Sequence, residues 1–231
     1  MIVDDPAQDH LFDAVWNRPG LGVRDRRIVS IVCVSAAVDG PAMDAHVHAA
    51  LASGDLTIEQ MKELVLQFAV YCGWPRASQL EMTVRAQWQR LHEERGEETP
   101  PYPQLDVSDL GPTDPAERIA GGVRSFEEIN LVQAPSQDSP YFYTGILNYV
   151  FGHLWLRPGL SRRDRRMITV PCVGVSDAIG PIWSHITSAM GSGDISYDEM
   201  REIILHLGAY AGPARARVML DVAEQWKATQ P

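Results

Sequence analysis

The 231-residue chain has almost no lysine and no long hydrophobic run. Lys62 and Lys227 are its only lysines, and the net charge is −10 at neutral pH. Nucleic acids and anionic membrane surfaces both depend on clustered cationic side chains, so we expect neither as a partner. No apolar run approaches the roughly 20 residues that a membrane-spanning helix needs.

Cysteine is scarce as well, and no cofactor-binding motif is present. Cys33, Cys72 and Cys172 form no Cys-x-x-Cys pair, which argues against a disulfide framework and against a zinc site. No Gly-rich phosphate loop or dinucleotide fingerprint appears. We therefore expect a protein without metal or other cofactors. The acidic first residues show no signal peptide, and free thiols suit a reducing compartment, so we expect a cytoplasmic location.

What the sequence does contain is a long internal repeat. Residues 18–27 recur with nearly the same letters at 157–166, an offset of 139 positions (164 − 25 for the shared aspartate). The same offset relates His46 to His185. A repeat of this length indicates a duplicated domain rather than a solenoid unit.

The repeat predicts two domains, residues 1–98 and 141–231, joined by a linker over residues 99–140. The linker opens with a stretch rich in proline and glycine, which is typical of an extended connection. One helix is expected within it, over residues 114–133. The two domains should pack on each other as a pseudo-dimer.

Helical signals dominate both halves, and no segment shows sustained alternation of apolar and polar residues. Thr57 with Gln60 and Ser196 with Glu199 are capping boxes that mark helix starts. The fold class is therefore predicted to be all-α. The remaining expected helices cover residues 25–38, 42–52, 75–95, 163–175, 181–190 and 213–227.

His46 and His185 occupy the same place in the two halves, each on the second helix. Histidine exchanges protons near neutral pH, so either residue could protonate a carbanion or accept a proton from an acidic C–H group. The alternative is a histidine buried for structural reasons. Such a residue would recur in a duplicated domain too, so the repeat alone does not separate the two interpretations.

His206 and Tyr210 lie one helical turn apart in the second half. A tyrosine in this position can orient the histidine or donate to an oxyanion, although a tyrosine before a Gly-Pro break often only completes a core. We expect the pair to work with His185 of the same half. The first half has Gln67 and Tyr71 at these positions, which makes it the weaker half.

Arg27 and Arg166 end the repeated Arg-Asp-Arg-Arg run at the start of a helix. Either guanidinium could bind a substrate carboxylate through two parallel hydrogen bonds. The alternative is a solvated or interface ion pair, which we favour for the neighbouring Arg24 and Arg26.

The run from Leu160 to Val170, followed by His185 and residues 200–212, resembles the carboxymuconolactone decarboxylase family. The first half resembles it as well, through residues 68–77. The two matches cover most of the chain outside the linker. The resemblance implies two tandem all-helical domains of the alkylhydroperoxidase-D-like fold. It also implies a homo-oligomer, and we expect a trimer that imitates a hexamer.

The family includes both decarboxylases and thiol peroxidases. The peroxidases need a Cys-x-x-Cys just before the helix histidine, and Asp39 and Ala42 stand there before His46, so peroxidase chemistry is not expected. The resemblance to the decarboxylases instead implies an acid–base site. The residues assigned to catalysis are His185, His206, Tyr210 and His46. Those assigned to substrate binding are Arg166, Arg27, Tyr71 and Gln67.

We therefore expect a cofactor-independent lyase or isomerase that forms an enolate from a small carboxylated or enolisable substrate. The alternative is a non-catalytic ligand-binding or assembly protein on the same scaffold. A single pocket shared by His185, His206 and Tyr210 would favour the enzyme, whereas histidines packed against aliphatic side chains would favour the binding protein.

Overall fold

The computed structural model describes residues 12–104 and 110–230. Within these two ranges the chain is helical, has no strand, and has no helix long and apolar enough to cross a membrane. The helices, in chain order, are η1 (Phe12–Trp16), α2 (Val23–Ala37), α3 (Gly40–Ser53), α4 (Ile58–Cys72), α5 (Trp74–Glu94), α6 (Pro115–Asn130), η2 (Tyr141–Phe151), η3 (Leu154–Leu156), α7 (Arg162–Val175), α8 (Ile179–Gly191), α9 (Tyr197–Ala211) and α10 (Pro213–Ala228).

The all-α prediction is confirmed, and local sequence signals account for most helix ends. The Thr57 and Ser196 side chains cap α4 and α9 through the predicted capping boxes. Ser161 caps α7 in the same way. Helix α6 ends at Asn130, three residues before the predicted end, because Leu131 adopts a left-handed backbone conformation with φ 58°.

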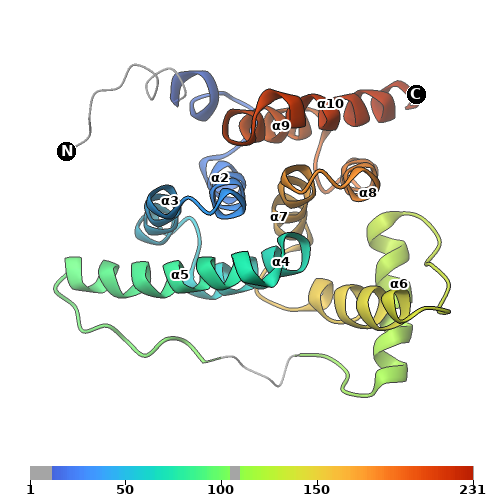
Figure 1. Ribbon diagram of the computed structural model, residues 1–231, viewed down its shortest axis with the longest axis horizontal. Helices are drawn as coiled ribbons and strands as arrows, with labels where there is room; N and C mark the ends of the chain where they lie inside the picture. The colour runs from blue at the N-terminus through green and yellow to red at the C-terminus, as the bar shows by residue number, and fades with distance from the viewer. Residues whose placement is uncertain (1–11, 105–109, 231) are drawn as a thin grey trace.

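The internal repeat reappears in the helix order, since α2 to α5 correspond to α7 to α10. Figure 1 shows α2 and α7 in the middle, with α4 and α5 on one side and α9 and α10 on the other. Helix α2 packs against α9, and α7 packs against α4. Each central helix is thus covered by the third helix of the opposite half. A site on α2 or α7 can therefore include side chains of both halves.

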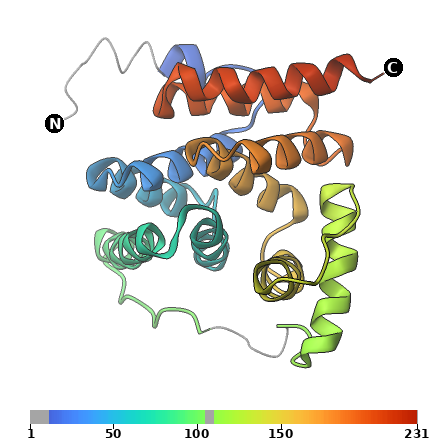
Figure 2. The same ribbon diagram turned by 45° about the vertical axis from the view of Figure 1, so that its right-hand side comes forward.

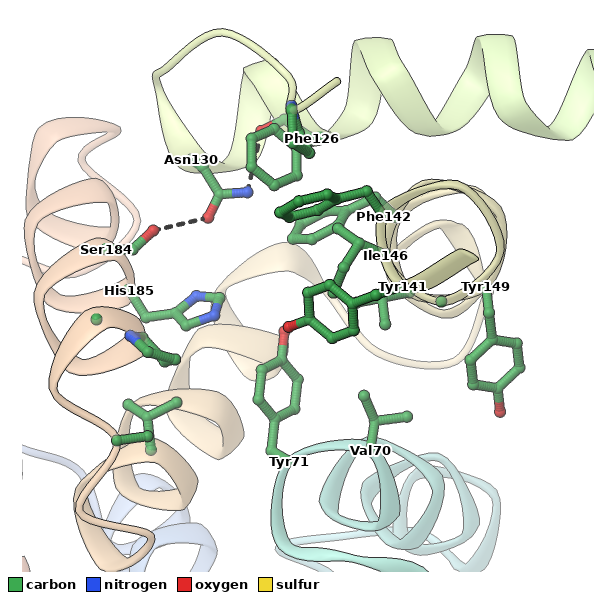
Figure 3. Close-up of a pocket in the computed structure, with 18 of the residues that line it drawn as sticks. Val70, Tyr71, Phe126, Asn130, Tyr141, Phe142, Ile146, Tyr149, Ser184 and His185 are labelled. Carbon is green, nitrogen blue, oxygen red and sulfur yellow. Dashed lines mark hydrogen bonds between the residues drawn. The ribbon is translucent and has the colours of Figure 1, made fainter. Parts of the chain in front are cut away.

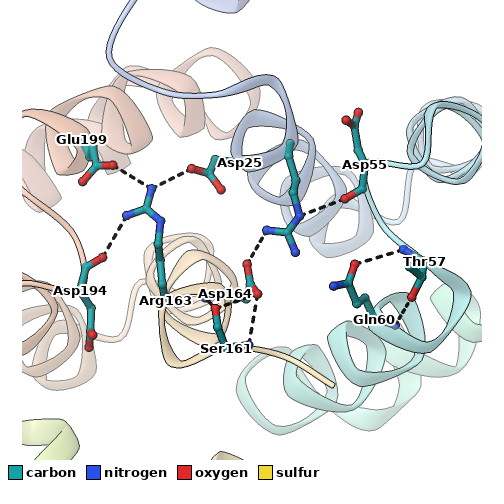
Figure 4. A network of polar contacts seen from close by, with 10 residues as sticks. Asp25, Asp55, Thr57, Gln60, Ser161, Arg163, Asp164, Asp194 and Glu199 are labelled. Carbon is teal, nitrogen blue, oxygen red and sulfur yellow. Dashed lines mark hydrogen bonds and ion pairs between the residues drawn. The ribbon is translucent and has the colours of Figure 1, made fainter. Parts of the chain in front are cut away.

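Reciprocal ion pairs join the two central helices (Figure 4). The Arg24 side chain bonds Asp164, and Arg163 bonds Asp25 at 2.8 Å. The offset of 139 positions relates these two pairs to each other. The ion pair predicted for Arg24 is confirmed, and its partner, Asp164, lies in the other half of the chain.

Helix α6 and the π-helix η2 pack against each other, and α6 also contacts α8, at the side of the central helices (Figure 2). Gly122 permits this packing, because a Cβ atom there would come within 1.8 Å of the Leu147 carbonyl oxygen. Leu147, Phe151 and Trp155 are buried within the chain. These three side chains therefore pack inside the chain and are not available for a subunit contact. Leu11, which opens the equivalent first-half segment, lies outside the described residues.

Candidate active sites

The candidate residues form two separate sites, and each site contains side chains of both halves. The His46 site comprises Trp16, Arg26, Arg27, Ser30 and His46 of the first half and Glu202, His206 and Tyr210 of the second. The His185 site comprises Trp155, Arg165, Arg166, Thr169 and His185 of the second half and Glu63, Gln67 and Tyr71 of the first.

The expected grouping of His185 with His206 and Tyr210 is wrong. Because α9 packs on α2, His206 and Tyr210 lie beside His46 instead. The single shared pocket that would have favoured the enzyme interpretation is therefore absent. Aromatic rings contact all three histidines.

The His46 imidazole is held between two aromatic side chains. The Trp16 ring stacks on it with a centroid distance of 5.9 Å and an interplanar angle of 3°. The Tyr210 hydroxyl lies 3.3 Å from His46 Nε2. Trp16 Nε1 donates to the same hydroxyl at 3.2 Å, so the tyrosine proton is directed toward His46.

A chain of hydrogen bonds runs from His206 to His46. His206 Nδ1 faces a guanidinium nitrogen of Arg26 at 3.5 Å. Since a guanidinium can only donate, Nδ1 accepts, and the proton of neutral His206 is on Nε2. That nitrogen lies 2.7 Å from Ser30 Oγ and donates to it. Ser30 in turn bonds Tyr210, whose hydroxyl reaches His46.

Burial keeps the histidines of the His46 site neutral. It lowers the pKa of His46 to about 4, with a further contribution from the positive charge of Arg27. It lowers the pKa of His206 to about 3, assisted by Arg26. Burial also raises the pKa of Tyr210. At neutral pH the site therefore holds two uncharged imidazoles and a protonated phenol beside a fixed guanidinium.

Arg27 keeps part of its guanidinium available. Its Nε bonds Asp55 at 2.6 Å, its side chain is 19% exposed, and its guanidinium lies 5.8 Å from the centre of the Trp16 ring. Across residues 12–104 and 110–230, no acceptor contacts its two terminal nitrogens. Two parallel N–H groups are thus free to bind a carboxylate.

The His185 site has the same plan with a different polar content. Trp155 Nε1 donates to the Tyr71 hydroxyl at 3.0 Å, and its ring lies 6.2 Å from the His185 ring. Gln67 replaces the second histidine and donates to Thr169 at 2.9 Å. His185 is 6% exposed, and its Nδ1 is buried without a hydrogen-bond partner. Burial lowers the pKa of His185 to about 3, assisted by Arg166.

Arg166 differs from Arg27 because its donors are already occupied. It bonds Asp194 at 3.3 Å and Ser188 at 3.0 Å, and it donates to the Ile129 carbonyl oxygen. Its side chain is fully buried. Ser188 corresponds to Ala49 in the first half, and Ile129 belongs to α6, which lies outside the repeat. The substrate-binding role predicted for Arg166 therefore has no free donor pair to support it.

A cavity of about 550 Å³ lies at the His185 site (Figure 3). Its walls come from α4, α6, η2 and α8, and the His185 ring faces into it. Most of the lining is apolar or aromatic, for example Val70, Phe142 and Ile146. Tyr71 also lines this cavity, whereas Gln67 and Arg166 are not among its lining residues.

Several residues of the two sites were not predicted from the sequence as functional. The tryptophans Trp16 and Trp155 and the glutamates Glu63 and Glu202 are identical in the two halves at the offset of 139 positions. Glu202 bonds the buried Arg26 at 3.0 Å, and Glu63 bonds Arg165 at 3.3 Å. These glutamates hold the first arginine of each site in place. Identity across the repeat was the signal that could have identified them.

Comparison with known proteins identifies the relatives of this chain. Residues 5–81 match the sequence model of the carboxymuconolactone decarboxylase family. The chain is 29% identical over 102 residues to 4-carboxymuconolactone decarboxylase of Acinetobacter baylyi, which covers 44% of this chain and 71% of that protein. This chain is therefore similar to the carboxymuconolactone decarboxylase family over residues 5–81. It is also 31% identical over 67 residues to nitrosuccinic acid decarboxylase npaB of Metarhizium robertsii, covering 29% of this chain and 46% of that protein.

The segment that matches the carboxymuconolactone decarboxylase model contributes residues to both sites. It contains His46 and Arg27 of one site and Gln67 and Tyr71 of the other. Each site is completed by residues beyond position 81. Within the described part of the chain, no group of three histidine, cysteine, aspartate or glutamate side chains could hold a metal ion.

The cysteines give no support to thiol chemistry. Cys33, Cys72 and Cys172 are buried and unpaired. Burial raises the pKa of Cys33 to about 12 and that of Cys172 well above its usual value, whereas a hydrogen bond to Cys172 lowers the pKa of the buried Cys72 thiol. Protonated thiols are poor nucleophiles, which agrees with the missing Cys-x-x-Cys.

Proposed function

We propose that this protein is a cofactor-independent decarboxylase-like lyase and that the His46 site performs the reaction. One observation carries this proposal. His46, His206 and Tyr210 converge on the same place as Arg27, whose terminal nitrogens have no acceptor among the described residues. A decarboxylase needs a cation for the carboxylate or the developing oxyanion and an acid to protonate the carbanion.

Substrate binding would begin at Arg27. Its two terminal N–H groups form a bidentate donor for one carboxylate or for an enolate oxygen. Asp55 fixes the guanidinium through Nε and leaves the opposite edge open. The Trp16 ring lies beside both His46 and Arg27 and would shield a substrate bound there from water.

Binding of an anion would convert His46 into an acid. The pKa of free His46 is low because the imidazole is buried and lies near the positive Arg27. A bound carboxylate offsets the charge of Arg27 and itself attracts a proton to the imidazole. His46 must therefore take up a proton when the substrate binds.

The reaction then breaks one carbon–carbon bond. The bonding electron pair stays on the substrate carbon when CO₂ leaves and is delocalised onto an adjacent acceptor group. His46, now protonated, transfers its proton to that carbon, and the hydrogen-bond chain through Tyr210 and Ser30 to His206 keeps the imidazole oriented. The products are CO₂ and the protonated substrate fragment, and solvent supplies the next proton.

The relatives suggest the class of substrate. Their names designate decarboxylases of carboxymuconolactone and of nitrosuccinic acid. Each of these acids carries a group, a lactone or a nitro group, that can accept negative charge. For this chain we propose a small polycarboxylic acid with such an electron-accepting group.

A CO₂-release assay with purified protein tests this proposal. The substrate panel would contain carboxylated lactones, β-keto acids and nitro acids, with the saturated dicarboxylic acid glutarate as a non-reactive control. Release of CO₂ from at least one acid with an acceptor group, abolished by His46→Ala, is the expected result. Absence of CO₂ release from every acid would contradict the proposal.

Two further expectations from the sequence stay proposals. One is the division into domains 1–98 and 141–231 with a linker between them. The other is assembly into a trimer that imitates a hexamer. Tyr141, Ile179 and Trp183 are exposed apolar side chains on η2 and α8 and are candidates for the subunit contact. Light scattering at micromolar concentration would detect a trimer, and a monomeric mass would refute it.

A further inference from the structure

The cavity at the His185 site differs in chemistry from the site proposed for catalysis. Its described lining contains no aspartate, glutamate, lysine or arginine. The charge of Arg166 lies behind the wall, fully buried and bonded to three acceptors. A carboxylate in this cavity would lose its hydration without gaining a cation, which is costly.

Several of the polar side chains that line the cavity already have hydrogen-bond partners within the chain. Ser184 donates to Asn130 at 3.2 Å, and Asn130 donates to the Phe126 carbonyl oxygen at 3.1 Å. Ser176 bonds the Cys172 carbonyl oxygen at 2.8 Å. The Tyr71 hydroxyl accepts from Trp155.

Among the described lining residues, His185 is the one with a buried side-chain polar atom that has no hydrogen-bond partner. It makes no hydrogen bond within the described part of the chain, and its side chain is 94% buried (100 − 6). The edge of the Tyr71 ring and the face of the Trp155 ring fix the imidazole at centroid distances of 5.3 and 6.2 Å. A rigid, buried and unpartnered polar group at a cavity wall can bond a ligand. A neutral imidazole has one donor and one acceptor nitrogen, which suits a hydroxyl group.

We propose that this cavity is a second ligand site that binds a neutral aromatic alcohol of one or two rings, with the hydroxyl bonded to His185. The aromatic walls formed by Phe126, Tyr141 and Phe142 (Figure 3) favour stacked or edge-on contacts with a ring. A volume of about 550 Å³ lies within the range of small-molecule sites. This site is independent of turnover at the His46 site.

Isothermal titration calorimetry with the full chain at pH 7.5 tests this inference. The probes are 2-naphthol, which is neutral at this pH, and 2-naphthoate, which has the same rings and a carboxylate. We expect one 2-naphthol per chain and an affinity for 2-naphthoate at least about 10-fold lower, since the anion finds no cation. Replacement of the hydrogen-bonding group by His185→Phe should weaken 2-naphthol by up to about 10-fold.

Two glycine variants locate the site. Gly145 lines the cavity, and a Cβ atom there meets no atom within 4 Å, so Gly145→Phe should fill the cavity and abolish binding. Gly121→Phe adds the same side chain outside the lining, at a position that is equally open, and should leave binding intact. Gly180→Phe, on the opposite wall, is a second blocking variant if Gly145→Phe does not fold.

His46→Ala separates this inference from the proposed catalysis. It should remove turnover and leave 2-naphthol binding unchanged. Equal or tighter binding of 2-naphthoate, binding that survives both blocking variants, binding lost in His46→Ala, or no binding of 2-naphthol at millimolar concentration would each overturn the second site.

Discussion

The His46 site and the His185 site share a tryptophan, two arginines and a tyrosine, but they differ in the environment of the second arginine. Among the residues that the structure describes, Arg27 has one acceptor and Arg166 has three. The additional acceptors come from Ser188, where the first half has Ala49, and from α6, which lies outside the repeat. The duplicated framework is thus maintained, while the same arginine is left free for an anion in one site and is used for structure in the other.

The two sites also differ in the residue one turn before the tyrosine. His206 continues the hydrogen bonds of the His46 site, whereas Gln67 occupies that place in the His185 site. Glutamine donates and accepts hydrogen bonds but does not exchange a proton at neutral pH. Proton transfer is therefore assigned to the site that contains His46, and apolar binding to the site that contains His185.

The largest expected effect comes from the two histidines themselves. His46→Ala should lower the turnover number by about 10²–10⁴-fold, the usual contribution of a general acid, while His185→Ala should change it by no more than a few-fold. This order is the reverse of the one that the sequence alone predicts. Steady-state kinetics on both variants, with circular dichroism to verify folding, checks it. A larger loss in His185→Ala would transfer the reaction to the other site.

Substitution of Arg27 should mainly lower activity, whereas substitution of Arg166 should mainly lower stability. Arg27→Gln should raise KM and lower kcat/KM by about 10- to 100-fold, since charge-assisted hydrogen bonds to the substrate are lost. Arg166→Gln should instead reduce the free energy of unfolding by about 1–3 kcal/mol, because the buried hydrogen bonds to Ser188 and the Ile129 carbonyl oxygen are lost while Asp194 keeps its ion pair with Arg162. Urea denaturation and substrate titration of both variants separate these effects. Equal losses of affinity in the two variants would mean that both arginines bind substrate.

Replacement of His206, which has Gln67 as its counterpart in the other site, should have a smaller effect on turnover. His206→Gln makes the His46 site resemble its counterpart and should lower the turnover number by about 10-fold, since glutamine keeps the bond to Ser30 but loses the proton-exchanging group. Gln67→His in the other site is the matched control and should leave turnover unchanged. An increase in turnover with Gln67→His would show that the His185 site can also catalyse.

Stability at acidic pH should depend on His185. Its pKa of about 3 in the folded chain lies below the ordinary value of 6.5. Between these values the unfolded chain binds the additional proton, so stability falls as the pH drops below 6.5. His185→Phe should abolish up to about 2 kcal/mol of the stability lost between pH 7 and pH 5. Urea denaturation at the two pH values measures this, and an unchanged pH dependence would mean that His185 is not buried as described.

The sequence was sufficient to predict where the helices lie, but it was insufficient to predict which residues meet in each site. Capping boxes and Gly-Pro breaks are local signals, so the ends of α4 and α9 could be read from residues such as Thr57 and Ser196. No local signal shows that α4 packs on α7 of the second half and α9 on α2 of the first. Hydrophobic periodicity indicates which face of a helix is buried but not which helix covers that face. His206 was therefore assigned to the wrong histidine. The reciprocal pair of Arg163 with Asp25 was hidden for the same reason.

The central claim, that the His46 site binds the substrate carboxylate and the His185 site does not, can be tested by ¹⁵N NMR of the histidine side chains. The probe is paraconate, a saturated lactone carboxylate that cannot lose CO₂ through an enolate. The account predicts that saturating paraconate raises the pKa of His46 above its value of about 4 in the free protein, that Arg27→Gln abolishes this rise, and that His185 stays neutral throughout. A rise in the pKa of His185 with no change at His46 would contradict the account.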